Sequence, residues 1–460
     1  MTEDTIFAPS TAPGRAGLAV IRVSGPAART ALVALGGSAL PPPRRAALRT
    51  FIDPADGHAI DRGLLLWFPA PASFTGEDLG ELHLHGGRAV IAAALEALAR
   101  LPGLRPAEAG EFTRRAFDND KLDLSAVEGL ADLIDADTEA QRRQALRQMQ
   151  GGLARLTGGW AARLTRVLAH FEAAIDFVEE GLPAELEQAA LAEAAQVAAE
   201  IAAALDDHHR GERLREGLSA VILGAPNAGK SSLLNALARR DVAIVSEVAG
   251  TTRDVVEVQL DLAGYPVTLA DTAGLRALET ADAAAAQAAI EREGMARARE
   301  RAAVADVTLL LVDLEAALRD AAALDAVGAL FDSRSILLLN KADRCDPAAV
   351  RRLCRDLQDC APLVISAKTG EGLEAVLARL VERSGEAFGG AEGGAGITRL
   401  RHRRALEDCR DALLRAPGTG LLELKAEELR LALRALGRIT GRVDVENLLD
   451  IVFSEFCIGK

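Results

Sequence analysis

The sequence predicts a multidomain α/β protein: an α+β N-terminal domain, a helical bundle domain, and an α/β domain with a mostly parallel sheet inserted into the helical one. The length of 460 residues suggests about three domains of roughly 150 residues each. Between about residues 218 and 384, the apolar runs "SAVILG", "VTLLLV", "SILLLN" and "PLVIS" are each followed by a loop and a helical stretch. That alternation is typical of a mostly parallel sheet.

The segments on either side of this domain differ from it in their predicted secondary structure. From about residue 5 to 118, short β-like stretches such as "LAVIRVSG" and "LGELHLHGG" alternate with the helical "AVIAAALEALARL", which predicts a compact α+β domain. From about residue 122 to 216, apolar residues recur at helical spacing, which predicts a helical bundle. The Gly-rich "SGEAFGGAEGGAG" resembles a flexible linker, and helical periodicity then returns up to the chain end.

Composition and charge narrow the classes of function. The five cysteines show no CxxC spacing, so neither a disulfide framework nor a zinc site is predicted, and a cytoplasmic location is favoured. We expect no targeting segment and no membrane partner, because no apolar run approaches the roughly 20 residues that span a bilayer. With a net charge of −14, any RNA partner would need a local basic patch or a helper protein.

The inserted domain contains a phosphate-binding motif. In "VILGAPNAGKSSLLNAL", the residues Gly224, Gly229, Lys230 and Ser231 form the G-x-x-x-x-G-K-[ST] pattern, after an apolar strand and before a helix. The loop's backbone N–H groups would surround phosphate oxygens, Lys230 would reach the β- and γ-phosphates, and the Ser231 hydroxyl would bind Mg²⁺. The predicted nucleotide contacts of this loop are Asn227, Ala228, Gly229, Lys230, Ser231 and Ser232.

Three further motifs follow in order and predict GTP rather than ATP. In "DTAG", a carboxylate would hold the Mg²⁺ water and Gly274 N–H would sense the γ-phosphate. In "NKAD", the Asp343 carboxylate would accept both N–H donors of the guanine edge, so that adenine would leave it unpaired. In "SAK", the Ala367 N–H would reach the guanine carbonyl. The residues of these motifs are Asp271, Thr272, Ala273 and Gly274; Asn340, Lys341 and Asp343; and Ser366, Ala367 and Lys368.

Two details predict a cation-assisted GTPase. Leu275 follows "DTAG", where small signalling GTPases carry a water-orienting Gln. The segment "VSEVAGTTRD" and Asn227 offer oxygen ligands close to the phosphates, which suit K⁺. The predicted metal ligands are Asn227, Ser246, Val248 and Thr251 for K⁺, and Ser231 and Thr252 for Mg²⁺, with Glu247, Ala249 and Gly250 as further nucleotide contacts. Alternatively, Asn227 only braces the loop by hydrogen bonds.

With these motifs in place, the chain resembles the MnmE (TrmE) family of tRNA modification GTPases over essentially its whole length. The resemblance rests on "GAPNAGKSSLLNAL", "GTTRD", "DTAGLR", "SFTGED" with "HGG", "GEFTRRAF", "KLDL" and the closing "FCIGK". It implies a folate-binding and dimerisation domain at 1–120, a helical domain at 121–216 and 385–460 with the CIGK tail, and an inserted potassium-dependent GTPase domain at 217–384.

The same resemblance implies an activity. A homodimer would join an FAD-dependent partner of the MnmG (GidA) family in a heterotetramer. Using 5-formyl- or 5,10-methylene-tetrahydrofolate, this complex would form 5-carboxymethylaminomethyluridine at the wobble position of tRNA. An alternative of another class is a ribosome-assembly or regulatory GTPase switch, which would have no use for a reduced folate.

The resemblance also places folate-binding residues. Arg22, Glu81 and Lys121 match the family's folate-pocket positions, and the terminal Lys460 completes the pocket. An anionic glutamate tail and a pterin rich in N–H donors require basic groups and a carboxylate. Nearby, His83 and His85 alternate on one strand face, but no third metal ligand is evident, so we favour a structural role for both.

The tail thiol Cys457 has two interpretations. It is either a buried structural thiol or a reactive one, because Lys460 lies three residues further and its charge would favour the thiolate. In the family this tail reaches the folate pocket, which places Cys457 among the predicted catalytic residues.

The chain departs from the family pattern at two places. Asp120 stands where the family has Gly before the lysine of its "NGKLDL" run. After "DTAGLR" the acidic segment is longer than usual. Alignment backward from "EREGMARA" selects Glu291 as the hydrolytic residue, and Glu279 and Asp282 remain alternatives.

Overall fold

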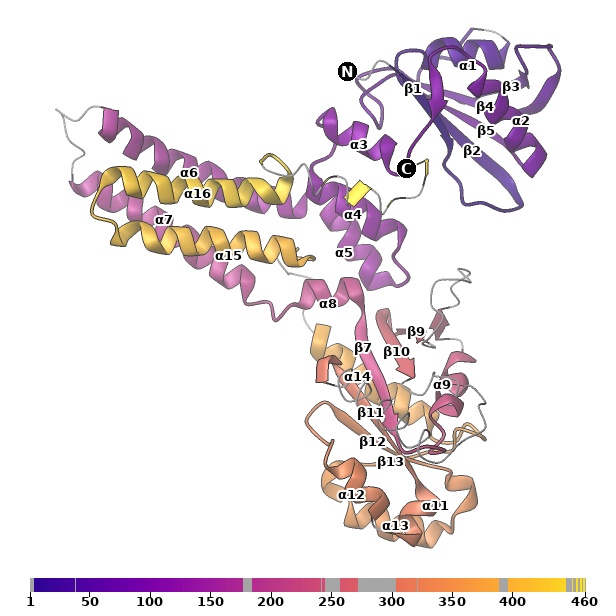
Figure 1. Cartoon of the computed structure of the whole chain (residues 1–460), viewed down its shortest axis with the longest axis vertical. Coiled ribbons are helices and arrows are strands. Elements are labelled where there is room, and N and C mark those ends of the chain that lie inside the picture. Colours follow the sequence, from indigo (N-terminus) through magenta and orange to yellow (C-terminus); the bar gives the residue numbers. More distant parts are fainter. Residues whose placement is uncertain are drawn as a thin grey trace, which may run out of the picture. The chain divides into compact units, whose positions relative to one another are not determined.

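The computed structural model describes residues 4–37, 39–176, 184–240, 242–244, 257–271, 303–320, 322–388 and 396–443, together with residues 449, 452, 453, 456, 458 and 459 (Figure 1). The chain divides into two compact units. The first unit consists of Met1–Ile134, Leu146–Ala202 and Arg404–Lys460, and the second of Asp135–Ala145 and Ala203–Arg403.

A six-stranded sheet forms the N-terminal part of the first unit, with the order β3-β4-β5-β2-β1-β6. Neighbouring strands are antiparallel except β1 and β6, which are parallel. Alternate residues Ile21, Leu82 and Leu84 pack with helices α1 and α2 on one face, and Arg22, Glu81 and His83 therefore lie on the other. The elements are β1 (Thr5–Pro9), β2 (Ala16–Ser24), α1 (Ala28–Gly36), β3 (Ala47–Ile52), β4 (Ala59–Phe68), β5 (Leu79–Gly86), α2 (Arg88–Ala99) and β6 (Leu104–Pro106).

Helices make up the rest of the first unit. Helices α6 and α16 pack side by side along their lengths, and α6 buries Leu164 and Phe171 (Figure 1). Near α4, Leu124 and Val127 pack against Phe453 from the C-terminal segment. The helices that lie wholly or partly in this unit are α3 (Glu111–Asp118), α4 (Leu124–Ile134), α5 (Glu139–Met149), α6 (Gly152–Asp176), α7 (Ala184–Leu205), α15 (Leu400–Arg415) and α16 (Leu422–Thr440).

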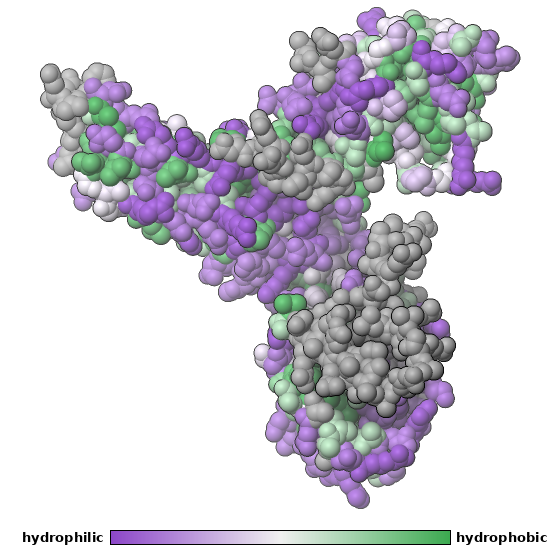
Figure 2. All heavy atoms as spheres, viewed as in Figure 1, coloured by the Kyte–Doolittle hydropathy of each residue, from purple (hydrophilic) through white to green (hydrophobic). Residues whose placement is uncertain are grey.

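The helical surface is mixed in polarity. Figure 2 shows hydrophilic residues over most of the visible face of these helices, with hydrophobic residues in small groups among them. Among the described residues, no helix combines the length and the apolar content needed to cross a membrane.

The second unit contains a seven-stranded sheet with the order β13-β12-β11-β7-β10-β9-β8. Strands β13 to β10 of this order are parallel, and β9 and β8 are antiparallel to their neighbours. Strand β12 is buried along its whole length, as the apolar run "SILLLN" predicts. The strands are β7 (Leu218–Gly224), β8 (Ala243–Ile244), β9 (Glu257–Leu262), β10 (Tyr265–Asp271), β11 (Val307–Asp313), β12 (Ser335–Asn340) and β13 (Leu363–Val364).

Helices cover both faces of this sheet. One core joins the sheet to α9 and α14, and another joins it to α11, α12 and α13. The predicted fold class, with a mostly parallel sheet in the inserted domain, is therefore confirmed. The helices are α8 (Arg210–Glu216), α9 (Lys230–Ala238), α11 (Leu314–Arg319), α12 (Ala322–Gly328), α13 (Pro347–Asp356) and α14 (Leu373–Phe388), with short 3₁₀ turns at Ala342–Arg344 and Gln358–Cys360.

The predicted Gly-rich linker begins too early. Helix α14 continues through "SGEAF" and ends at Phe388, so the prediction of a linker is wrong for that part. The Phe388 side chain is fully buried, and its ring stacks on Tyr265 with 5.1 Å between centroids. This tertiary contact extends the helix beyond the point where the small residues alone favour a loop.

The beginning of helix α5 belongs to the second unit. The Ala140 N–H donates to the Gly264 carbonyl at 3.2 Å, in the turn between β9 and β10. The Gln141 and Gln144 amides donate to the carbonyls of Arg215 and Gly211, at 3.1 and 3.0 Å. Sequence periodicity alone assigned this stretch to the helical domain. The division into segments 1–120, 121–216, 217–384 and 385–460 remains a prediction.

Candidate functional site

The phosphate loop connects the end of β7 to the start of α9. Gly229 has a φ of 101°, a conformation that glycine adopts most readily, and α9 begins at the next residue. The Lys230 ammonium donates to the carbonyls of Gly224 and Ala225 at 3.0 and 3.1 Å, so it spans the loop. Asn227 also has a positive φ, of 63°. This strand–loop–helix arrangement points backbone N–H groups and a helix N-terminus at the position of a phosphate.

Asn340 connects the phosphate loop to the guanine motifs. It ends β12, is 2% exposed, and donates from Nδ2 to the Ala228 carbonyl at 2.7 Å. Its Oδ1 accepts the Ala367 N–H at 3.0 Å. A Cβ built on Gly229 would lie 2.4 Å from Asn340 Nδ2, which explains why glycine is needed there. One side chain thus holds together three of the predicted nucleotide-binding segments.

Asp343 presents an ionised acceptor at the same edge of the sheet. The Ser366 hydroxyl donates to Asp343 Oδ1 at 2.7 Å, and the Thr369 N–H donates to the Ser366 oxygen at 3.2 Å. The hydrogen bond from Ser366 holds the pKa of the Asp343 carboxyl below its usual range. Because Asp343 is exposed, this carboxylate is accessible to a pair of N–H donors on a base.

Asp313 supports the guanine motif, and sequence reasoning missed it. It lies opposite Asn340 in the register of β11 and β12, and its Oδ2 accepts from the Lys341 ammonium at 2.6 Å. Its Oδ1 caps helix α11. Burial raises the pKa of Asp313, but Lys341 and the capping N–H groups outweigh burial and hold the pKa below its usual value. The position of Asp313 at the carboxyl end of a buried strand was the signal available in the sequence.

Many predicted residues lie outside the described part of the chain. Of Asp271 the structure describes the backbone, which ends β10 opposite Ile222. Ser231 and Ser232 lie in the first turn of α9, and Lys368 follows Ala367 on the surface. The predictions for Ser246, Glu247, Val248, Ala249, Gly250, Thr251, Thr252, Thr272, Ala273, Gly274, Glu279, Asp282, Glu291, Cys457 and Lys460 fall outside the described residues.

A second polar cluster lies on the N-terminal sheet, on the face away from α1 and α2. Arg22 and Glu81 are cross-strand neighbours, and the Arg22 Nε lies 3.1 Å from Glu81 Oε1. His83 Nε2 lies 3.1 Å from Glu81 Oε2. The guanidinium of Arg22 lies over the Phe74 ring, 5.6 Å from its centroid. The structure therefore brings together two of the predicted folate residues and adds His83 and Phe74, which the sequence did not single out as site residues.

Lys121 contacts the same loop that carries Phe74. Its ammonium donates to the Pro71 carbonyl at 2.8 Å, and Gly76, with a φ of 79°, leaves room for the Lys121 stem. Asp120 has a φ of 55°. Glycine adopts this conformation at least cost, so Asp120 is a less favourable residue for this backbone than glycine would be.

The described end of the chain is fixed beside the N-terminal strands. Ile458 forms an antiparallel bridge with Ala109, and the Gly459 carbonyl accepts from the Ser10 hydroxyl at 3.0 Å. Gly459 has a φ of 99°, and a Cβ added there would lie 1.9 Å from the Pro9 carbonyl oxygen. Ile458 therefore lies against a residue that follows β6, and Gly459 lies against the end of β1.

The histidines of β5 pair with carboxylates. His83 contacts Glu81, and His85 Nδ1 lies 2.9 Å from Asp61 Oδ1. Among the described residues, no group of three or more His, Cys, Asp or Glu side chains is arranged to hold a metal ion.

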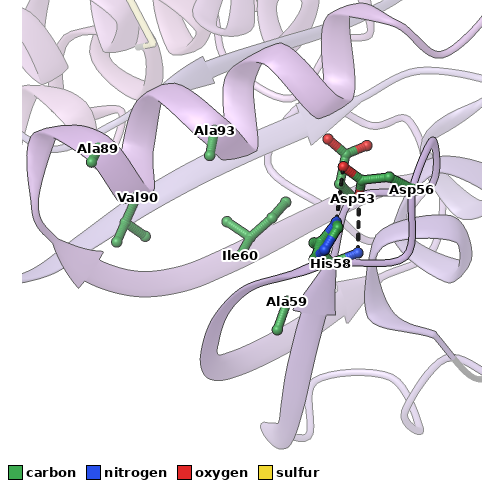
Figure 3. A pocket seen from close by; sticks show the side chains of 8 residues that line it. All are labelled: Asp53, Asp56, His58, Ala59, Ile60, Ala89, Val90 and Ala93. Carbon is green, nitrogen blue, oxygen red and sulfur yellow. Dashed lines mark hydrogen bonds and ion pairs between the residues drawn. The ribbon is translucent and has the colours of Figure 1, made fainter.

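A hollow of about 270 Å³ lies elsewhere on the N-terminal domain, between α2 and the turn joining β3 and β4 (Figure 3). Its polar groups are used locally: Asp53 pairs with Arg100, and Asp56 lies 3.1 Å from His58 Nδ1. Neither Arg22 nor Glu81 lines it, so it is separate from the polar cluster.

The phosphate loop, Asn340 and Asp343, on a mostly parallel sheet, define a P-loop GTPase. Two family models cover nearly the whole chain: "GTP-binding protein TrmE N-terminus" matches residues 5–121, and "MnmE helical domain" matches residues 124–457. The chain belongs to the tRNA modification GTPase MnmE family.

Full-length relatives carry this name. The chain is 55% identical over 475 residues to tRNA modification GTPase MnmE of Rhodospirillum rubrum, with 100% of both chains covered. It is 54% identical over 464 residues to that of Parvibaculum lavamentivorans, with 99% of this chain and 100% of the relative covered. A solved G domain of the T. maritima FeoB iron transporter is 25% identical and covers 36% of this chain and 98% of its own, with a TM-score of 0.25. The family assignment rests on the full-length relatives and the family models.

Proposed function

We propose that this protein hydrolyses GTP in the cytoplasm as part of tRNA wobble-uridine modification. Asp343 would select guanine, and the loop from Gly224 to Ser231 would hold the phosphates, with Mg²⁺ bound by Ser231 and Thr252. The Asp343 carboxylate, ionised and exposed beside Ser366, supports guanine selection. The donor chemistry of the loop suits a hydrated Mg²⁺–phosphate unit, because hard oxygen ligands bind this ion.

Hydrolysis would depend on a second cation. We propose K⁺ bound by Asn227, Ser246, Val248 and Thr251, with Glu291 positioning the attacking water. Asn227 lies in the phosphate loop with a φ of 63°, and its side-chain oxygen is a hard ligand of the kind that suits K⁺. Two GTPase domains of a homodimer would pair when K⁺ binds.

The modification itself would require a reduced folate and a flavoprotein. Relatives named tRNA modification GTPase MnmE share half or more of their residues with this chain. By this kinship we propose a heterotetramer with an FAD-dependent protein of the MnmG (GidA) family, acting on tRNA to form 5-carboxymethylaminomethyluridine. The one-carbon donor would be 5-formyl- or 5,10-methylene-tetrahydrofolate.

The polar cluster on the N-terminal sheet carries the folate part of this proposal. Arg22 and Lys121 both contact the loop around Phe74, and Glu81 supplies a carboxylate beside Arg22. A pterin offers N–H donors to a carboxylate and a flat ring to an aromatic side chain, and its glutamate tail offers an anion to basic groups. The Gly459 carbonyl accepts from the Ser10 hydroxyl of the same domain, and we propose that Lys460 and Cys457 take part in the folate chemistry.

Folate binding to the full-length protein tests this proposal against a GTPase switch. Isothermal titration with 5-formyl-tetrahydrofolate should show binding that Glu81→Ala and Arg22→Ala each weaken about tenfold or more, because each removes a charge-assisted contact. Arg29→Ala, an exposed arginine on α1 at the opposite face of the sheet, is the matched control. A wild-type protein that binds no reduced folate would favour the ribosome-assembly or regulatory switch.

A further inference from the structure

We propose that His83 is a positioning residue of the N-terminal site: it holds the Glu81 carboxylate in the orientation that recognises the paired N–H donors of a 2-amino-4-oxopyrimidine ring. The inference rests on the proposed folate function, and names the residue that sets the site's selectivity for the ring.

Each oxygen of Glu81 has its own partner. Arg22 Nε contacts Oε1 at 3.1 Å, and His83 Nε2 contacts Oε2 at 3.1 Å. A carboxylate oxygen accepts hydrogen bonds, so His83 Nε2 is the donor of this second one. With one donor on each oxygen, rotation of the carboxyl group is restricted.

This orientation matters for a ring with adjacent donors. Each carboxylate oxygen has two lone pairs, so Glu81 retains acceptor capacity after binding Arg22 and His83. A 2-amino-4-oxopyrimidine ring presents its ring N–H and its amino group side by side, and a carboxylate accepts such a pair in bidentate fashion when its plane is fixed. If the carboxylate could rotate freely, fixing its orientation on binding would cost conformational entropy, and this cost would offset part of the interaction.

The position of His83 in the sheet separates this role from core packing. The neighbouring Leu82 and Leu84 are buried against the helices, whereas the His83 side chain, 22% exposed, lies on the opposite face with Arg22 and Glu81. His83 is paired in register with Val20, whose carbonyl accepts from Ser10 N–H. His83 and Ser10 therefore both neighbour Val20, and Ser10 is the residue whose hydroxyl donates to the Gly459 carbonyl.

His85 provides a matched comparison within the same strand. It lies two residues further on the same face and also contacts a carboxylate, Asp61, at 2.9 Å. Its side chain is 71% exposed, and its partner belongs to β4 rather than to the polar cluster. Substitution of His85 removes the same chemistry without touching Glu81.

The test measures binding of 5-formyl-tetrahydrofolate and of its 2-desamino analogue by the full-length protein at neutral pH. His83→Leu should weaken binding of the natural ligand by roughly tenfold, because an unrestrained carboxylate loses part of a charge-assisted contact. His83→Gln, which keeps an N–H donor, should restore most of the affinity. His85→Leu should bind as the wild type does.

The analogue distinguishes positioning from general damage. It lacks one of the two donors, so His83→Leu should weaken its binding much less than that of the natural ligand, whereas a misfolded site would lose both ligands equally. Equal losses, or normal binding of the natural ligand by His83→Leu, would overturn the inference while leaving folate binding established. A wild-type protein that binds neither ligand would instead remove the proposed function together with the inference.

Discussion

The amide of Asn340 occupies the space that a side chain at Gly229 would need. Its Nδ2 donates to the Ala228 carbonyl at 2.7 Å and would lie 2.4 Å from a Cβ built on Gly229. The guanine motif and the phosphate loop are therefore in direct contact, although the bonded residues lie 112 positions apart in the sequence.

Gly229→Ala should weaken binding of guanine nucleotides by at least about tenfold. The added Cβ displaces the Asn340 amide, and an alanine with a φ of 101° costs roughly 1–2 kcal/mol in backbone strain. Titration with a fluorescent GDP analogue measures the loss. Gly328→Ala, in helix α12 of the same domain, is the matched control, because no described atom beyond its chain neighbours and the backbone of its own helix lies within 4 Å of its added Cβ. Wild-type affinity in Gly229→Ala would contradict the contact.

Asp343→Asn should change the base preference from guanine to xanthine. The substitution replaces an acceptor by a donor at the edge of the base, which suits the extra carbonyl of xanthine. Hydrolysis of GTP, XTP and ATP by each protein measures the preference. Asp346→Asn is the control. Asp346 lies three residues after Asp343 and caps helix α13, and asparagine caps a helix as well as aspartate does. Equal turnover of ATP and GTP by the wild type would count against the assignment.

Asp313→Asn should destabilise the protein at neutral pH by about 1–2 kcal/mol. Asparagine keeps the cap of α11 but loses the charge that pairs with Lys341. A carboxyl whose pKa falls on folding stabilises the native state above its unfolded-state pKa, and loses that contribution as the pH falls through the folded pKa. The pKa of Asp313 is lowered from 3.8, so the gap between wild type and variant should close as the pH falls below that value.

Calorimetric unfolding at several pH values measures this gap. Asp320→Asn is the control, because Asp320 is exposed at the end of the same helix and its side chain accepts from the local Ala322 N–H. A gap that stays constant down to pH 2 would show that Asp313 acts without its charge.

Hydrolysis should require K⁺ and Glu291. Leu275 cannot orient water, so loss of a water-positioning group or of a transition-state charge should slow turnover by about 10²-fold, or roughly 2.7 kcal/mol. Glu291→Ala should bind GTP normally but hydrolyse it slowly, and Na⁺ in place of K⁺ should slow the wild type comparably. Single-turnover hydrolysis distinguishes the residues: a fully active Glu291→Ala beside an inactive Glu279→Ala would move the role to Glu279. Full activity in Na⁺ would remove the cation mechanism.

The ordered motifs made much of the nucleotide site predictable. Each motif is local, because a buried apolar strand ends at a loop that carries the functional side chain, as at Gly224 and Asn340. The contacts that join the motifs were not predictable in this way. The pairing of Lys341 with Asp313 and the bond from Asn340 to Ala228 depend on strand order in the sheet.

The fold class was equally predictable, whereas ends and boundaries were not. Helix α14 extends to Phe388 because its ring packs on Tyr265, more than one hundred residues earlier. The start of α5 joins the second unit through hydrogen bonds from Gln141 and Gln144. The helical spacing of these residues does not predict which carbonyl groups they contact. His83 could be interpreted only once its carboxylate partner was known, and Asp120 only once its backbone conformation was known.

We propose above that this GTPase takes part in modifying the wobble uridine of tRNA. Nucleoside analysis of tRNA from cells that lack the protein, with and without a plasmid that restores it, tests the claim most directly. We predict that 5-carboxymethylaminomethyluridine and nucleosides derived from it disappear in the deletion strain and return with the wild-type gene but not with Cys457→Ser. An unchanged nucleoside profile in the deletion strain would contradict the account.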